Sequence, residues 1–168
     1  DNYMLRISEL GEIQNDTQVL HKMALSHIIA TDLETMVELV DSISVQKKKL
    51  DQMLTDYKQY VDEDVNEAYE SMLASYDGIK YEIESLMGFS ALGSKEEAYT
   101  IANGTLAEYV KAMEDYVSAM VELTNQGAEE ARVSLGNVYD SAMFGTMIMV
   151  VISVTAFVIA LYVVLRMV

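Results

Sequence analysis

Histidine and cysteine, two residue types that often carry catalysis or bind metals, are scarce in this chain. None of its 168 residues is Cys and only two are His. His21 and His27 lie six positions apart, which places them on different faces of a helix, and neither completes a His-x-x-x-His or Glu-x-x-His pair. The spacing therefore predicts neither a metalloprotease helix nor a di-iron bundle. We expect no catalytic residue, no metal ligand and no cofactor, and a packed or tip-exposed His27.

Tyrosine is the next candidate for chemistry, because the chain has eleven Tyr. The Tyr residues on or beside the predicted helix seams are Tyr57, Tyr60, Tyr69, Tyr76, Tyr109 and Tyr116. They are either amphipathic core residues whose hydroxyls reach the edge of the core, or the lining of an aromatic cavity that closes on a ligand. Gln46, in the middle of one seam, would either set helix register or mark a polar pocket. The ligand-binding residues stay unknown from the sequence.

The charge of the chain is strongly negative. Twenty-seven Asp and Glu stand against eleven Lys and Arg, for a net charge of -16. Nucleic acid is therefore not an expected partner, since phosphate binding needs a basic surface. We expect the acids to form a solvated outer face, with a site for a cationic ligand or a divalent metal as the alternative. Lys47, Lys48 and Lys49 form the only basic run, and on a helix they would fan across a solvated face.

Apolar residues recur at helical spacing through most of the chain, and no stretch alternates with period two. The clearest seam is Met36, Leu39, Ile43, Gln46, Leu50, Met53, Tyr57 and Tyr60. Two others are Tyr69, Met72, Tyr76, Ile79, Ile83 and Leu86, and then Leu106, Tyr109, Met113, Tyr116, Met120 and Leu123. The first seam is less regular and contains Leu10, Ile13, Thr17, Leu20, Ala24, His27 and Thr31. The absence of Pro and Cys also argues against a turn-rich or disulfide-linked fold.

Capping residues indicate where one helix ends and the next begins. Thr31 and Glu34 match a capping box, and Gly93 followed by Ser94 and Glu97 reads as a helix stop and a new start. Residues 62–64 supply N-caps for a third helix, although the second and third helices could instead be one long helix. Residues 103–105 are a second possible break, so the last helix starts near residue 94 or near residue 105.

These boundaries predict an all-α protein: an antiparallel up-down four-helix bundle in residues 1–141, continued into one C-terminal transmembrane helix. The bundle helices are expected at about 1–31, 33–61, 64–90 and 95–141.

The expected transmembrane helix is residues 142–166. Residues 142–165 carry no charge, and 24 residues at about 1.5 Å each are long enough to cross a bilayer of about 30 Å with some tilt. A buried core helix is the alternative. Arg166 after the span and acids before it predict a cytoplasmic C-terminus and an extracytoplasmic domain at 1–141, in the inner or plasma membrane. Because the sequence starts without a signal segment, we expect the N-terminal anchor and the cytoplasmic signalling part of the whole protein to lie outside it.

Three segments before the apolar stretch carry a resemblance. They are residues 28–60, the Gly-Ser-Lys-Glu-Glu-Ala of 93–98 and the Met-Val-Glu-Leu-Thr-Asn of 120–125. In this order they resemble the four-helix-bundle sensor module of methyl-accepting chemotaxis proteins. The residues that match the family's two short motifs are Gly93, Glu96, Glu97, Ala98, Met120, Leu123 and Asn125.

The resemblance implies a receptor and not an enzyme. Its bundle would form a homodimer in the bilayer and meet a small-molecule ligand or a periplasmic binding protein. Ligand binding would displace the last helix and signal to a cytoplasmic module. The family's best-known amino-acid receptors hold ligand carboxylates with arginines of the first helix. Here Arg6, Arg132 and Arg166 are all expected near the membrane end, so we transfer no such site. The alternatives are the sensor domain of a histidine kinase or cyclase, and a membrane-anchored structural or adhesion bundle without a small ligand.

Overall fold

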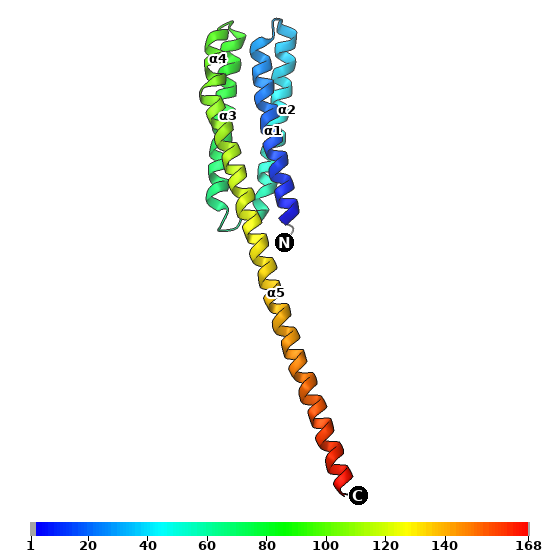
Figure 1. Ribbon diagram of the computed structural model, residues 1–168. Helices are drawn as coiled ribbons and strands as arrows, with labels where there is room; N and C mark the ends of the chain where they lie inside the picture. The colour runs from blue at the N-terminus through cyan, green and yellow to red at the C-terminus, as the bar shows by residue number, and fades with distance from the viewer. Residues whose placement is uncertain (1–2, 168) are drawn as a thin grey trace. The chain divides into compact units, whose positions relative to one another are not determined.

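The computed structural model describes residues 3–167, and these residues are almost entirely helical. In chain order the elements are α1 (Tyr3–Ile29), α2 (Leu33–Tyr57), the short 3-10 helix η1 (Lys58–Tyr60), α3 (Asn66–Ala91), α4 (Lys95–Asn103) and α5 (Thr105–Met167) (Figure 1). No strand occurs among the described residues. The predicted all-α fold is confirmed.

The chain divides into two compact units, Asp1–Asn125 and Gln126–Val168. Within the first unit, α1, α2 and α3 pack side by side with α4 and the first part of α5, which together make the fourth rod of the bundle (Figure 1). The second unit is the remainder of α5, which contains the apolar segment. The predicted bundle followed by an apolar C-terminal helix is therefore also confirmed.

Most predicted seam residues form the core. Every predicted seam residue of α3 is buried, and on α1 the seam is buried from Leu10 to His27. The prediction for α5 is half wrong. Val110, Val117 and Thr124 face the core together with Leu106, Met113 and Met120, whereas Tyr109 is exposed and Tyr116 and Leu123 lie at the edge. Spacings of three and four both reach the same side of a helix, so the choice is made by what the neighbouring helices can accommodate. The Tyr109 ring lies against Gly78 of α3, where an added Cβ would come within 2.6 Å of it.

The turn between α1 and α2 is closed by Asp32 and not by the expected Thr31. One Asp32 carboxylate oxygen accepts the Thr35 backbone N–H at 2.8 Å, and the other accepts the Thr35 hydroxyl at 2.9 Å. These bonds lower the pKa of Asp32. The predicted helix start is thus displaced by one residue, because a carboxylate accepts such bonds more strongly than a hydroxyl.

The remaining helix boundaries are set by residues in the turns themselves. The second and third helices are separate: residues 61–65 form a turn in which Asp62 accepts the backbone N–H of Val65 at 3.3 Å. Gly93 ends α3 as predicted, with a φ of 81° that favours Gly. Ser94 makes no side-chain capping bond, so the expected box with Glu97 does not form. Gly104 separates α4 from α5, and an added Cβ there would meet the Thr100 carbonyl oxygen at 2.9 Å.

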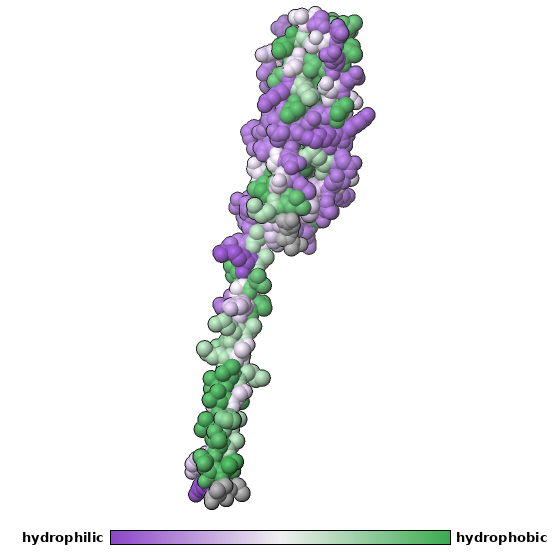
Figure 2. All heavy atoms as spheres, turned by 90° about the vertical axis from the view of Figure 1, so that its right-hand side faces the viewer, coloured by the Kyte–Doolittle hydropathy of each residue, from purple (hydrophilic) through white to green (hydrophobic). Residues whose placement is uncertain are grey.

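In the second unit, α5 has the composition of a membrane span. It is the one described helix long and apolar enough to cross a membrane, and none of its apolar window is buried. Figure 2 shows this segment as mostly hydrophobic. The hydroxyls of Thr146, Ser153 and Thr155 donate to carbonyls four residues earlier, which satisfies them without water. The exposure argues against the core-helix alternative.

Candidate functional site

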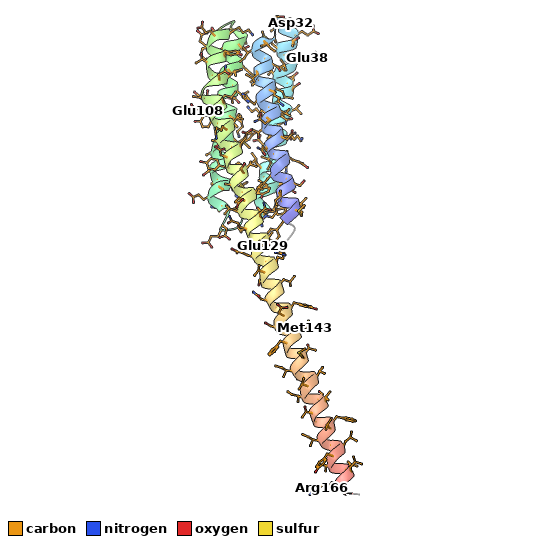
Figure 3. The ribbon with its side chains drawn as sticks, viewed as in Figure 1. Asp32, Glu38, Glu108, Glu129, Met143 and Arg166 are labelled. Carbon is orange, nitrogen blue, oxygen red and sulfur yellow. The ribbon has the colours of Figure 1, made fainter. Side chains whose placement is uncertain are left out.

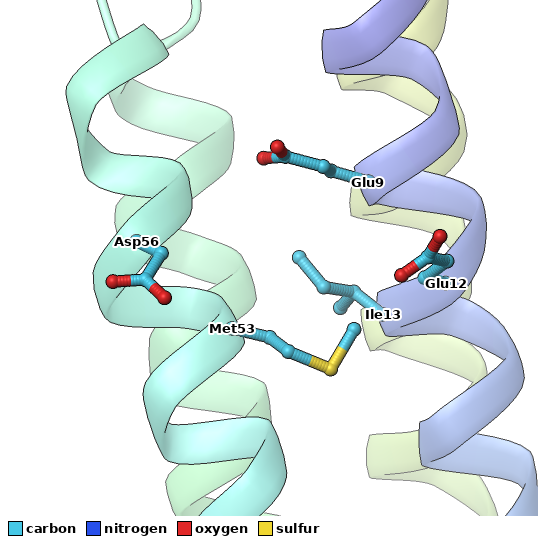
Figure 4. Close-up of a pocket in the computed structure, with 5 residues that line it drawn as sticks. All are labelled: Glu9, Glu12, Ile13, Met53 and Asp56. Atoms are coloured by element: carbon cyan, nitrogen blue, oxygen red, sulfur yellow. The ribbon is translucent and has the colours of Figure 1, made fainter.

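A small hollow of about 190 Å³ lies between α1 and α2. Glu9, Glu12 and Ile13 of α1 line it together with Met53 and Asp56 of α2. In Figure 4, Ile13 and Met53 extend into the space between the two helices, and Glu9 reaches across from α1. The hollow thus combines an apolar floor with an acidic rim.

The carboxylates of the acidic rim have no ion-pair partner among the described residues. The Glu9 carboxylate accepts the Tyr60 hydroxyl at 3.3 Å, and the Asp56 carboxylate accepts the side-chain amide of Gln52 at 2.7 Å. No ion pair joins Glu9, Glu12 or Asp56 to a Lys or Arg within residues 3–167. An ammonium group is the complementary ligand chemistry. In the same range, no group of three His, Cys, Asp or Glu residues is placed to hold a metal ion.

A second, larger hollow of about 370 Å³ lies between α2 and α3, and Tyr69 and Tyr76 line it. Their hydroxyls donate to the backbone carbonyls of Leu54 at 2.8 Å and of Lys47 at 2.9 Å. Burial raises the pKa of Tyr76, so the phenol stays protonated. These two residues therefore support the interpretation as amphipathic core residues, and they also form the wall of a hollow.

Residues of the basic run and Gln46, all on α2, make ion pairs and a hydrogen bond to α1 and α3. Lys47 pairs with Glu84 of α3 at 2.6 Å, and Lys49 pairs with the buried Asp16 of α1 at 2.5 Å. Two of the three Lys thus cross to other helices and do not merely coat a solvated face. The side chain of Gln46 donates to the Asp16 carbonyl at 3.2 Å, which favours the register interpretation over the polar pocket.

Outer acids elsewhere match the solvated face that we predicted. Asp32, Glu38 and Glu108 are exposed, and Figure 3 shows them projecting from the outside of the helices. Their charges are screened by salt over about 8 Å at physiological ionic strength.

A buried polar cluster joins α1, α3 and α4 at the end of the bundle that holds the α1–α2 turn. We call His27, Ser90 and Lys95 the tip cluster. The Ser90 hydroxyl donates to the His27 carbonyl at 2.9 Å and accepts from Lys95 Nζ at 3.0 Å, and it lies 3.0 Å from His27 Nδ1. Lys95 also donates to the Ala30 carbonyl at 3.3 Å, at the C-terminal end of α1. Every contact of the Ser90 hydroxyl is thus a hydrogen bond to another element.

Burial and the nearby Lys95 charge lower the pKa of His27, so this side chain is neutral and packed. His21 lies on a different part of α1. Its pKa is also lowered by burial, against opposing contributions from the Ala102 carbonyl and Glu114. The two His residues do not form a common site.

A second buried polar cluster lies toward the other end of the bundle. We call Arg6 of α1, Tyr57 of α2 and Thr124 of α5 the base cluster. Arg6 Nε, the Tyr57 hydroxyl and the Thr124 hydroxyl are shielded from solvent. Arg6 and Thr124 lie within hydrogen-bonding reach of the Tyr57 hydroxyl, and both oppose the rise in its pKa that burial causes. The other end of the Arg6 guanidinium pairs with the half-exposed Asp62 at 3.4 Å.

The sequence patterns singled out His27 and Tyr57, but they gave no buried polar role to Arg6, Ser90, Lys95 or Thr124. Arg6 and Thr124 nevertheless occupy seam positions: Arg6 lies four residues before Leu10, and Thr124 follows Val117 by seven. A polar residue at a seam position is the signal that could have identified both.

Comparison with protein families identifies the bundle. A model described as a four helix bundle sensory module for signal transduction matches residues 1–139. A search of curated proteins finds no match. The match covers the whole bundle and most of the chain, and agrees with the resemblance drawn from its short motifs. The chain therefore belongs to the family of four-helix-bundle sensory modules for signal transduction.

Proposed function

We propose that this chain is the ligand-sensing part of a transmembrane chemotaxis receptor, which passes a displacement of α5 through the membrane to a cytoplasmic signalling module. The observation that carries the proposal is the extent of α5, a single helix of 63 residues that begins in the bundle and contains the apolar segment. Hydrogen bonds along the axis make a helix resist compression, so such a helix transmits a small slide or rotation. A ligand shifts its position only by binding one position more tightly, commonly by about 1–3 kcal/mol.

The orientation belongs to the same proposal. Arg166 follows the apolar segment, whereas the bundle carries most of the acids, and a cytoplasmic flank favours Lys and Arg. The bundle would then be extracytoplasmic in the inner or plasma membrane. Fusions of alkaline phosphatase and of a fluorescent protein after residue 167 test this: we expect fluorescence without phosphatase activity, and the reverse pattern would refute the orientation.

The partners are a homodimeric second copy, the lipid bilayer and either a small molecule or a periplasmic binding protein. The α1–α2 hollow is the first place to look for a small ligand. It is concave, has an apolar floor, and its carboxylates lack a cationic partner among the described residues. Small organic amines are therefore the first compounds to screen.

A chimaera tests the proposal directly. Residues 1–167 are joined to the N-terminal anchor and the cytoplasmic module of a well-studied chemotaxis receptor, and kinase output is recorded against a metabolite panel. We expect at least one compound to change the output. Ser134→Pro should abolish this response without preventing ligand binding, because Pro breaks a helix, and Ser134→Ala is the matched control. A response that survives Ser134→Pro would exclude transmission through α5.

A structural or adhesion bundle remains the competing function. A ligand that binds the folded state raises the melting temperature, as RT ln(1 + [L]/Kd) requires. A thermal-shift screen in which no metabolite stabilises the chain, together with a silent chimaera, would favour the adhesion bundle. Replacing the output module by that of a histidine kinase or a cyclase separates the remaining receptor types.

A further inference from the structure

The hollow between α2 and α3 is a gap that two tyrosine side chains hold open. Tyr69 and Tyr76 lie seven residues apart on the same side of α3, and both are buried. Each ring crosses to α2, where the hydroxyl donates to a backbone carbonyl, that of Leu54 at 2.8 Å and that of Lys47 at 2.9 Å. These two bonds set the spacing between the helices, so the gap is built into the fold.

Smaller side chains lie between the two tyrosines. Leu73 follows Tyr69 by four residues and precedes Tyr76 by three, and it is half-buried. It lines the gap together with Leu54 and Thr55 of α2. The volume of about 370 Å³ lies within the range of about 300–1,000 Å³ that small-molecule sites occupy. The middle of the gap can therefore hold the apolar part of a small organic molecule.

The charges that line the gap are separated by sign. At one end Lys80 pairs with Asp77 at 2.8 Å and with Asp51 at 3.4 Å, so two carboxylates share one ammonium. Lys58 follows Asp51 by seven residues, which is about 10 Å along the helix axis. It lines the gap and forms no ion pair with any residue of 3–167. The gap thus has a negative end, an apolar middle and a positive end.

We propose that the gap between α2 and α3 binds an ω-amino acid, a molecule with an ammonium group and a carboxylate at opposite ends of a short apolar chain. The carboxylate pairs with Lys58, and the ammonium group pairs with Asp51 and Asp77. The apolar chain lies against Leu73. An α-amino acid carries both charged groups on one carbon, so it cannot reach both ends of the gap. A role of this site in signalling rests on the proposed function, but binding does not.

Four compounds test whether the gap recognises two separated charges. The full chain in nanodiscs of neutral lipid is titrated with ε-aminocaproate, with glycine, and with caproate and hexylamine, which each carry one of the two charges. Binding is followed by ligand-observed NMR. We expect ε-aminocaproate to bind about tenfold more tightly than each of the others, because every other compound leaves one charged end of the gap without a partner. Absence of saturable binding of ε-aminocaproate, or equal binding of any other compound, would overturn the proposal.

Matched lysine variants test where the compound binds. Lys58→Gln removes the positive end of the gap, and we expect the affinity for ε-aminocaproate to fall about tenfold. Lys48→Gln is the control, because Lys48 is exposed on the same helix and does not line the gap, so the affinity should change by less than about twofold. Leu73→Trp should fill the gap and abolish binding, with circular dichroism to check that the helices form. Equal affinities of the two lysine variants would refute this site.

The chimaera separates this site from the proposed function. If ε-aminocaproate binds through Lys58 and changes the kinase output, Lys58→Gln should remove that response. If it binds through Lys58 but the chimaera is silent towards every compound, the site stands and the receptor assignment falls. If the chimaera responds to another compound and ε-aminocaproate does not bind, the receptor assignment stands and the site falls.

Discussion

The two ends of the bundle bury different kinds of polar cluster. In the tip cluster, Ser90 bonds to His27 and Lys95 on two other helices. In the base cluster, the Tyr57 hydroxyl lies close to Arg6 and Thr124, and the Arg6 guanidinium reaches the half-exposed Asp62. A neutral hydroxyl is the shared partner at the tip, whereas the base buries a guanidinium whose charge must be compensated. The comparison teaches that the tip depends on hydrogen bonds between helices and the base on how a buried charge is compensated.

The largest loss of stability should come from removing the Ser90 hydroxyl, the shared partner in the tip cluster. Ser90→Ala leaves His27 and Lys95 without their shared partner, and we expect a loss of about 2–3 kcal/mol in the free energy of unfolding. Urea denaturation measures it. Ser75→Ala is the matched control, because that hydroxyl bonds only within α3 and its loss should cost under about 1 kcal/mol. Equal losses would mean that the tip network has no special role.

Replacing Lys95 of the tip cluster and Arg6 of the base cluster compares the two ends of the bundle directly. Lys95→Met removes donors to Ser90 and to the Ala30 carbonyl, and should cost about 1–2 kcal/mol. Arg6→Met removes a buried charge whose partner Asp62 is half exposed, and should be neutral or slightly stabilising. Both values follow from parallel urea curves. A larger loss for Arg6→Met than for Lys95→Met would contradict this contrast between the two clusters.

The tip should also make stability depend on pH. The pKa of His27 is lowered in the folded state by burial and by Lys95, so the unfolded chain takes up the proton first. Stability is therefore complete above the ordinary His pKa of about 6.5 and falls as the pH decreases, by at most about 1.4 kcal/mol for this residue at pH 5.5. His21, which faces Glu114 and the Ala102 carbonyl, acts in the same direction.

Thermal melts at pH 7.5 and pH 5.5 measure this dependence, with His27→Gln as the control. The variant should lose less stability on acidification than the parent chain. Most carboxylates titrate below this range, so relief of their mutual repulsion should not mask the effect. A parent chain that becomes more stable at pH 5.5 would contradict the prediction.

The smallest effect concerns the α1–α2 turn. Asp32→Ala removes the N-cap of α2 and should cost about 1 kcal/mol, while Thr31→Ala should cost almost nothing. The melting temperatures of the two variants decide between the residue that caps in the structure and the one that the pattern favoured. A larger loss for Thr31→Ala would restore the original capping box.

Much of the fold could be predicted because helical periodicity is a local property. The α3 seam from Tyr69 to Leu86 is buried throughout, and Gly93 ends that helix with a positive φ. On α5 the pattern allowed two neighbouring seams, and the prediction chose Tyr109 and Tyr116 over Val110 and Val117. Spacing alone could not make this choice, because the neighbour of Tyr109 is Gly78, about 30 residues earlier in the chain.

The candidate sites were not predictable in the same way. The hollow between Glu9 and Asp56 and the contact of Gln46 with Asp16 each join residues from different helices. Ser90 and Lys95 lie five positions apart around the α3–α4 turn, and their partner His27 is about 60 residues away. Nothing in the local sequence sets which of these side chains meet.

The order of residues was sufficient to determine the helical class, the end of α3 and the start of α4 on either side of Gly93, and a C-terminal segment apolar enough for a bilayer. These features depend on backbone preference and on solvent transfer, which act residue by residue along the chain. Helix packing alone decided which polar groups are paired and which are not, because hydrogen-bond geometry depends on shifts of about 1 Å between helices. The tip and base clusters therefore exist only in the folded bundle.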